Sequence, residues 1–195
     1  MKMLPPFYQI HLENQLSRSE LLFLALLINV LQHLKQVSLE KIANALPLPI
    51  LFESRRKKVQ RFLSQPNLNI PNIWFPILQN WLADNFTGNQ TLYLVIDRTK
   101  WERKNLLMIS LVYDHRAIPI YFEALGKFGN SDFSVQSQLF SQVLPLFKNY
   151  RVVVLGDREF CSVKLANWLR EQGVQFCLRL KKMNLFKLKM EFGKT

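Results

Sequence analysis

The sequence contains few cysteines, few acidic residues and no hydrophobic run long enough to span a membrane. Its two cysteines, Cys161 and Cys177, form no C-x-x-C pair, which argues against a zinc site or a disulfide framework and favours a reducing compartment. The apolar run Leu21–Leu31 is shorter than the ~20 residues that a helix needs to cross a bilayer. Pro5 and Pro6 do not fit a signal peptide. We therefore expect a cytoplasmic protein without a membrane partner.

Acidic residues number 14 against 26 lysines and arginines, so the 195-residue chain carries a formal net charge of +12. The excess is spread over 1–90, 91–180 and 181–195 and is not confined to one tail. Such a basic surface favours polyanions, of which nucleic acid is the commonest. A basic protein with no polyanionic partner is the alternative. The apolar share of 49% is typical of a folded chain and excludes a disordered one.

Residues 1–88 are predicted to form a helical region, because apolar residues recur there at helical spacing and serines precede two of the runs. Helices are expected from Ser17 or Ser19 to about Gln36, over 38–46, over 50–64 and over 72–84. The third of them carries the basic residues Arg55, Arg56, Lys57, Lys58 and Arg61. A helix, a short helix, a turn and a basic helix are the outline of a helix-turn-helix module that binds DNA. A three-helix bundle with a solvated basic face is the alternative.

From Thr91 the pattern changes to short apolar runs separated by turns. Strands are expected over 92–97, 106–113, 118–125, 152–155 and 174–180, and helices over 131–148 and 162–172. The tight turn at 114–116 makes the second and third strands an antiparallel hairpin. The order β-β-β-α-β-α-β over 89–182 predicts an α/β fold with an incomplete, ribonuclease H-like mixed sheet.

Two of these strands end in an aspartate, Asp97 after TLYLVI and Asp157 after RVVVLG. In the predicted order the two strands are neighbours, so the two carboxylates should lie side by side at the strand ends. Adjacent carboxylates need a cation between them, and Mg²⁺ or Mn²⁺ prefers such oxygen ligands. Metals held this way catalyse phosphodiester hydrolysis and strand transfer. Taken singly, either aspartate could instead cap a turn.

Basic residues surround the two aspartates and are expected to hold backbone phosphates; these are Arg98, Lys100, Arg103, Lys104 and Arg158. Glu159 should point away from Asp157 if the chain is still extended there. The other carboxylates of this region are expected to be solvated or structural; these are Glu102, Asp114, Glu123 and Asp132.

Several segments resemble transposases of the insertion sequence 4 family. These are LPPFYQ at 4–9, SLEKIANALPLPILFESRRKK at 38–58, IDRTKW at 96–101, RAIPIYFEAL at 116–125 and VVLGDREFCSVKLANWL at 153–169. Asp97 with Thr99 matches the first aspartate motif of that family, and Asp157 in the D-R-x-F context matches the second. The resemblance implies a DDE catalytic domain of ribonuclease H-like fold, with Asp97 and Asp157 as catalytic ligands of Mg²⁺ or Mn²⁺. It also implies double-stranded DNA as partner, at transposon ends and target, a homodimer on DNA and association with the nucleoid.

The chain departs from that family after residue 182. The third carboxylate, a Glu in a Y-x2-R-x3-E-x6-K pattern, has no counterpart, because Glu171 and Glu191 stand in other contexts. The tail 183–195 fits no strand or helix, and we expect it to result from a frameshift near Lys181–Lys182. The chain is then an inactive copy of a transposase. Two alternatives remain: a DNA-binding protein without catalysis that acts as regulator or competitor at transposon ends, and a metal-dependent nuclease unrelated to transposition.

Overall fold

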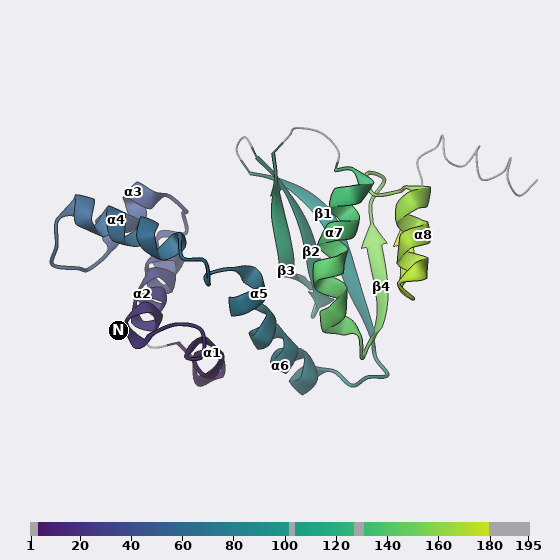
Figure 1. The fold of residues 1–195 in the computed structure, drawn as a ribbon, viewed down its shortest axis with the longest axis horizontal. Helices are drawn as coiled ribbons and strands as arrows, with labels where there is room; N and C mark the ends of the chain where they lie inside the picture. Colours follow the sequence, from purple (N-terminus) through teal and green to yellow (C-terminus); the bar gives the residue numbers. More distant parts are fainter. Residues whose placement is uncertain (1–3, 102–103, 127–130, 180–195) are drawn as a thin grey trace, which may run out of the picture. The chain divides into compact units, whose positions relative to one another are not determined.

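The computed structural model describes residues 4–101, 104–126 and 131–179, so Glu102, Arg103 and the tail 183–195 lie outside the described residues. The chain divides into two compact units, Met1–Leu82 and Ala83–Thr195. The first unit is helical and the second is a mixed α/β unit, as Figure 1 shows.

The helices of the N-terminal part follow the predicted order, with two additions. They are α1 (Pro6–Leu12), α2 (Arg18–Leu34), α3 (Leu39–Ala45), α4 (Phe52–Leu63), α5 (Ile70–Ile73) and α6 (Phe75–Asn85), the last of which ends in the second unit. The sequence did not predict α1, because two prolines precede its apolar residues. Pro6 stands in the first turn of α1, where a missing N–H and a fixed φ are compatible with a helix.

Serine caps explain where α2 and α3 begin. Ser17 and Glu20 form a capping box at the start of α2, and Ser38 caps α3 through the backbone N–H of Lys41. The apolar faces of α2, α3 and α4 then close around one core, made of Phe23, Leu27, Val30, Ile42, Leu46, Val59 and Phe62. These three helices therefore hold one another in place, including the basic helix α4.

The second unit is built on a five-stranded mixed sheet. Its strands are β1 (Thr91–Trp101), β2 (Lys104–Tyr113), β3 (Arg116–Leu125), β4 (Arg151–Gly156) and β5 (Gln175–Leu178). The spatial order is β3-β2-β1-β4-β5; β1 to β3 pair antiparallel, whereas β4 and β5 are parallel to β1. This order confirms the predicted ribonuclease H-like mixed sheet. The two-residue turn between β2 and β3 has positive φ at Asp114 and His115, the geometry that matches the twist of a hairpin.

Two helices cover one face of this sheet, α7 (Phe133–Val143) and α8 (Val163–Glu171), as seen in Figure 1. A short 3₁₀ helix, η1 (Leu144–Phe147), continues α7 where Pro145 removes a helical donor. Every second residue in the first half of β1 is buried, namely Leu92, Leu94 and Ile96. Together with their neighbours on β2 and β4, these side chains form the core face of the sheet.

Candidate metal and DNA sites

The pairing of β1 with β4 places Asp97 and Asp157 next to each other. The parallel ladder runs from Thr91–Arg151 to Ile96–Gly156, and each aspartate is the residue that follows the last pair. Neighbouring strands lie ~4.8 Å apart, so both carboxylates start from adjacent positions at the carboxyl ends of these strands. Both residues are exposed. The two aspartates that were predicted to meet are therefore brought together by the register of the sheet.

The first strand does not end at Asp97, in contrast to the prediction. β1 continues to Trp101, and its extension pairs with β2 alone, with Asp97 opposite Met108 and Lys100 opposite Asn105. The loss of apolar residues after Ile96 led to the shorter prediction. An antiparallel partner satisfies backbone groups whatever the side chains are, so the strand persists after the apolar run has ended.

Asp157 lies in a tight turn that begins where β4 ends. Its Oδ1 accepts the backbone N–H of Glu159 at 2.8 Å, and its carbonyl accepts the N–H of Phe160 at 3.2 Å. Phe160 is only 1% exposed and anchors the far side of the turn in the core. Asp157 thus caps its own turn with one oxygen, as the alternative interpretation allowed, while its side chain remains accessible.

Gly156 allows this turn to pack tightly against β1 and β5. A Cβ at this position would lie 2.8 Å from Cδ2 of Leu178 and 3.2 Å from Cγ2 of Ile96. The glycine is needed here for close approach, not for a positive φ.

Glu159 has a role that the sequence did not reveal. The chain turns at Asp157 and is not extended there, so the condition under which Glu159 would point away does not hold. Its Oε2 forms an ion pair with Nη2 of Arg98 at 2.9 Å, and the two side chains are 14% and 25% exposed. Arg98 was predicted to hold phosphate, but its guanidinium faces Glu159. No local pattern marks this pair, because Arg98 lies on β1 and Glu159 lies in the turn after β4.

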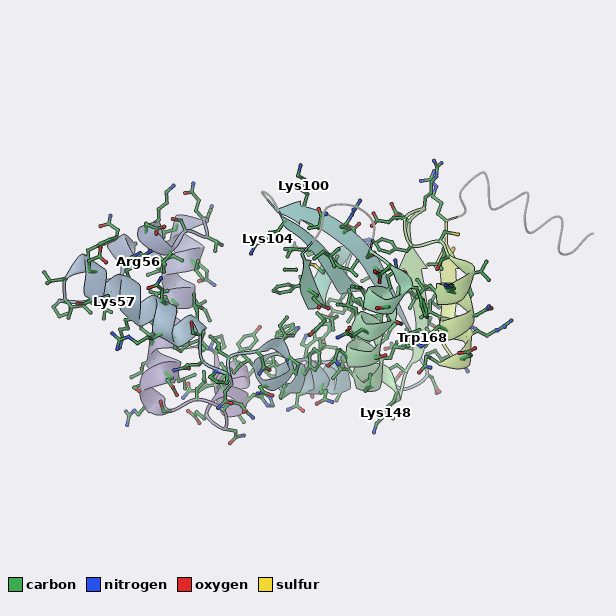
Figure 2. The ribbon with its side chains drawn as sticks, turned by 45° about the horizontal axis from the view of Figure 1, so that its top comes forward. Arg56, Lys57, Lys100, Lys104, Lys148 and Trp168 are labelled. Atoms are coloured by element: carbon green, nitrogen blue, oxygen red, sulfur yellow. The ribbon has the colours of Figure 1, made fainter. Side chains whose placement is uncertain are left out.

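Other predicted phosphate contacts of the second unit are open to solvent. Lys100 and Lys104 are exposed near the end of the β1–β2 hairpin, where Figure 2 shows both side chains pointing outward. Arg158 is exposed beside Asp157.

The basic residues of α4 divide into two groups. Three contact the protein itself: Arg55 donates to the carbonyls of Asn44 and Leu46, Arg56 pairs with Glu40 at 3.5 Å, and Lys58 lies over the ring of Phe23. The other two, Lys57 and Arg61, are exposed and have no ion pair or hydrogen bond with the residues that the structure describes. They stand four residues apart, so they lie on one side of the helix.

The donor set at Asp97 and Asp157 fits a hard divalent cation. Two adjacent, exposed carboxylates offer oxygen ligands, and the side chain of Asp97 forms no hydrogen bond or ion pair within the described part of the chain. Within the same residues, no group of three or more His, Cys, Asp or Glu side chains could hold a metal ion. Of the described residues, Asp97 and Asp157 are the pair of adjacent carboxylates that could hold such a cation at this edge of the sheet.

No single helix in the described ranges is long and apolar enough to cross a membrane. The pair of α2 and α3, bent by 107°, passes the same test of length and composition only when the two are taken together.

Comparison with known proteins identifies one family. The profile described as "Transposase DDE domain" matches residues 91–191, and no curated protein sequence matches the chain. Among solved structures, the Mos1 transposase catalytic domain with raltegravir and Mn has 14% identity and a TM-score of 0.32, covering 52% of this chain and 55% of that one. The Mos1 strand transfer complex has 14% identity and a TM-score of 0.30, covering 77% of this chain and 56% of that one. The chain thus spans little more than half of the length of these two neighbours.

Proposed function

The chain belongs to the family of transposases with a DDE domain, and on this premise we propose that it binds transposon DNA and holds a divalent metal between Asp97 and Asp157. The observation that carries the proposal is the register of β1 and β4, which ends one residue before each aspartate. We further propose that the chain belongs to the insertion sequence 4 family of transposases, because several of its segments resemble that family.

Asp97 and Asp157 are the residues that would ligate Mg²⁺ or Mn²⁺, since both are exposed and follow the last ladder pair. When bound, such ions activate a water or a 3′-hydroxyl and stabilise the leaving oxygen of a phosphodiester. Lys100, Lys104 and Arg158 would hold the backbone phosphates of DNA near this edge of the sheet, because all three are exposed cations close to the carboxylates in the sequence.

The helical region supplies the second part of the proposed function, contact with double-stranded DNA. Lys57 and Arg61 are the basic residues of α4 whose charges are not engaged within the described protein, so they are proposed to contact the DNA. We assign residues 1–88 to this DNA-binding region and 89–182 to the catalytic domain, with a homodimer on DNA.

The residues of this chain supply two of the three carboxylates that the family resemblance requires, so we propose that the chain as given binds metal and DNA without cleaving DNA. Nicking of plasmid DNA with Mg²⁺ tests this, and a rate that Asp97→Asn abolishes would show that the chain is an active enzyme. The rival function, a DNA-binding regulator or competitor at transposon ends, is favoured by the exposed Lys57 and Arg61. It requires these two cations but not the aspartates.

Calorimetric titration with Mn²⁺ tests the metal site directly. We expect the chain to bind Mn²⁺ in the presence of a short DNA duplex, Asp97→Asn to lose this binding, and Asp114→Asn to retain it. Asp114 is a matched control because it is an exposed aspartate at the opposite end of β2, and asparagine tolerates its positive φ of 47°. Equal binding by Asp97→Asn would rule out the two-aspartate site. DNA binding without any Mn²⁺ binding would favour the regulator.

A further inference from the structure

We infer that Arg98 and Glu159 are positioning residues whose ion pair holds the Asp97 and Asp157 carboxylates in register. This inference rests on the proposed metal site. The argument starts from the end of the ladder, because β1 and β4 share no paired residues after Ile96 and Gly156. Beyond that point the two aspartates belong to segments that leave each other, one along β2 and one into a turn.

The ion pair joins these two segments directly after they separate. Arg98 follows Asp97 on β1, and Glu159 is the residue whose backbone N–H donates to Oδ1 of Asp157. The 2.9 Å contact between Nη2 and Oε2 therefore links the neighbour of one aspartate to the residue that orients the other. A shift of either segment would change the spacing of the two carboxylates.

The side chain of Arg98 lies on the face of β1 opposite to the face that carries Asp97. Successive residues of a strand point to opposite faces, and Arg98 continues the row of Leu92, Leu94 and Ile96, which is buried. Asp97 lies on the other face and is exposed. The ion pair thus supports the site from the covered side of the sheet and leaves both carboxylates accessible to a metal.

The burial of Glu159 makes its position depend on Arg98. Its Oε1 is buried and has no hydrogen-bond partner among the described residues, so the contact with Arg98 is the ion pair that offsets removal of this carboxylate from water. Loss of one partner of a mostly buried pair leaves a charge that must move toward solvent. Any shift of the turn that accompanies this movement would displace the backbone N–H of Glu159 from Oδ1 of Asp157.

The same contacts argue against two simpler roles. The charge of Arg98 is matched by a carboxylate 2.9 Å away, which weakens its attraction for a phosphate. The Oε2 of Glu159 is engaged by Arg98, and no group of three or more His, Cys, Asp or Glu side chains that could hold a metal is found among the described residues. Both residues therefore act through Asp97 and Asp157.

The test compares Glu159→Gln, Arg98→Lys and wild type by Mn²⁺ titration and by amide hydrogen exchange at Glu159 and Phe160. We expect Glu159→Gln to raise the Mn²⁺ dissociation constant about tenfold, the lower end of the effect of outer-shell partners. Exchange at the two amides should rise roughly fivefold, as expected when the coupling of an ion pair is lost. Arg98→Lys keeps the charge and should fall between wild type and Glu159→Gln. Glu40→Gln is the control, because it removes the ion pair with Arg56 in the helical unit.

Unchanged exchange at Glu159 and Phe160 in Glu159→Gln would overturn the inference, as would unchanged Mn²⁺ affinity in a chain whose binding depends on Asp97. Tighter DNA binding by Glu159→Gln with unchanged Mn²⁺ affinity would also overturn it and would make Arg98 a phosphate contact. If wild type binds no Mn²⁺ through Asp97, the proposed metal site fails. The exchange rates alone then decide whether the pair orders the turn.

Discussion

Arg55 lies within the basic helix α4, yet its guanidinium holds the end of α3, so Arg55→Ala should destabilise the helical unit more than it weakens DNA binding. Nη1 donates to the carbonyl of Leu46 at 2.9 Å and to that of Asn44 at 3.3 Å. These carbonyls belong to the last turn and the C-cap of α3, where a cation also complements the helix dipole.

The magnitude follows from these contacts. A hydrogen bond from a charged donor contributes ~1.5–3 kcal/mol, but the Nε of Arg55 is buried without a partner among the described residues, which offsets part of the gain. We therefore expect Arg55→Ala to lower the stability of the helical unit by ~1–2 kcal/mol. Since 1.4 kcal/mol is about a factor of ten, amide exchange in α3 and α4 should accelerate about tenfold.

The assay follows hydrogen exchange of the full chain by mass spectrometry, together with DNA affinity at several salt concentrations. Lys57→Ala is the matched control: it should change stability by less than ~0.5 kcal/mol, because Lys57 is exposed. It should also reduce the slope of log affinity against log salt by about 0.9, which corresponds to one phosphate contact. A reduced salt slope in Arg55→Ala with unchanged exchange would refute the assignment of Arg55 to the fold.

Three further outcomes follow from the described contacts. Gly156→Ala should lower stability by about 1–3 kcal/mol and weaken Mn²⁺ binding, as measured by urea unfolding and calorimetry, because a Cβ there would press on Leu178 and Ile96. Ser17→Ala should lower the free energy of unfolding, measured in urea, by ~1 kcal/mol, because α2 loses its N-cap. The hydroxyl and the backbone N–H of Ser17 lower the pKa of Glu20, so its contribution to stability is present above the unfolded-state pKa and is lost as the pH falls through the lower folded-state pKa. When the pH is lowered into the acid range, the melting temperature of Glu20→Gln should therefore fall by less than that of wild type.

The order of the sheet could be predicted because each strand is a separate apolar run and each connection has a recognisable turn or helix. The hairpin turn at Asp114 and His115 and the end of α8 at Gly173, where φ is positive, are local signals of this kind. The adjacent positions of Asp97 and Asp157 could be predicted from this strand order, because the carboxyl ends of neighbouring parallel strands lie at the same edge of a sheet.

Contacts between distant side chains could not be predicted in the same way. Five adjacent or nearly adjacent cations on α4 looked equivalent, but Arg55 and Arg56 have partners on or next to α3 that only the packed helices bring within reach. Arg98 and Glu159 likewise meet only because β1 extends past β4 and the chain turns after Asp157. The sequence alone therefore does not tell whether a charged side chain contacts a ligand or another part of the protein.

The extension of β1 decides how the candidate site is built. Had β1 ended at Asp97, Arg98 would belong to a loop and nothing would fix the face to which its side chain points. Pairing of Arg98 with Leu107 on β2 keeps it in the strand, and the strand period then sends Arg98 and Asp97 to opposite faces. The ion pair of Arg98 with Glu159 therefore lies on the covered face of the sheet, and the carboxylate of Asp97 lies on the open face. The geometry of the site therefore depends on the β1–β2 hairpin as much as on the β1–β4 ladder, and changes that loosen the hairpin beyond Ile96 should weaken metal binding without touching either aspartate.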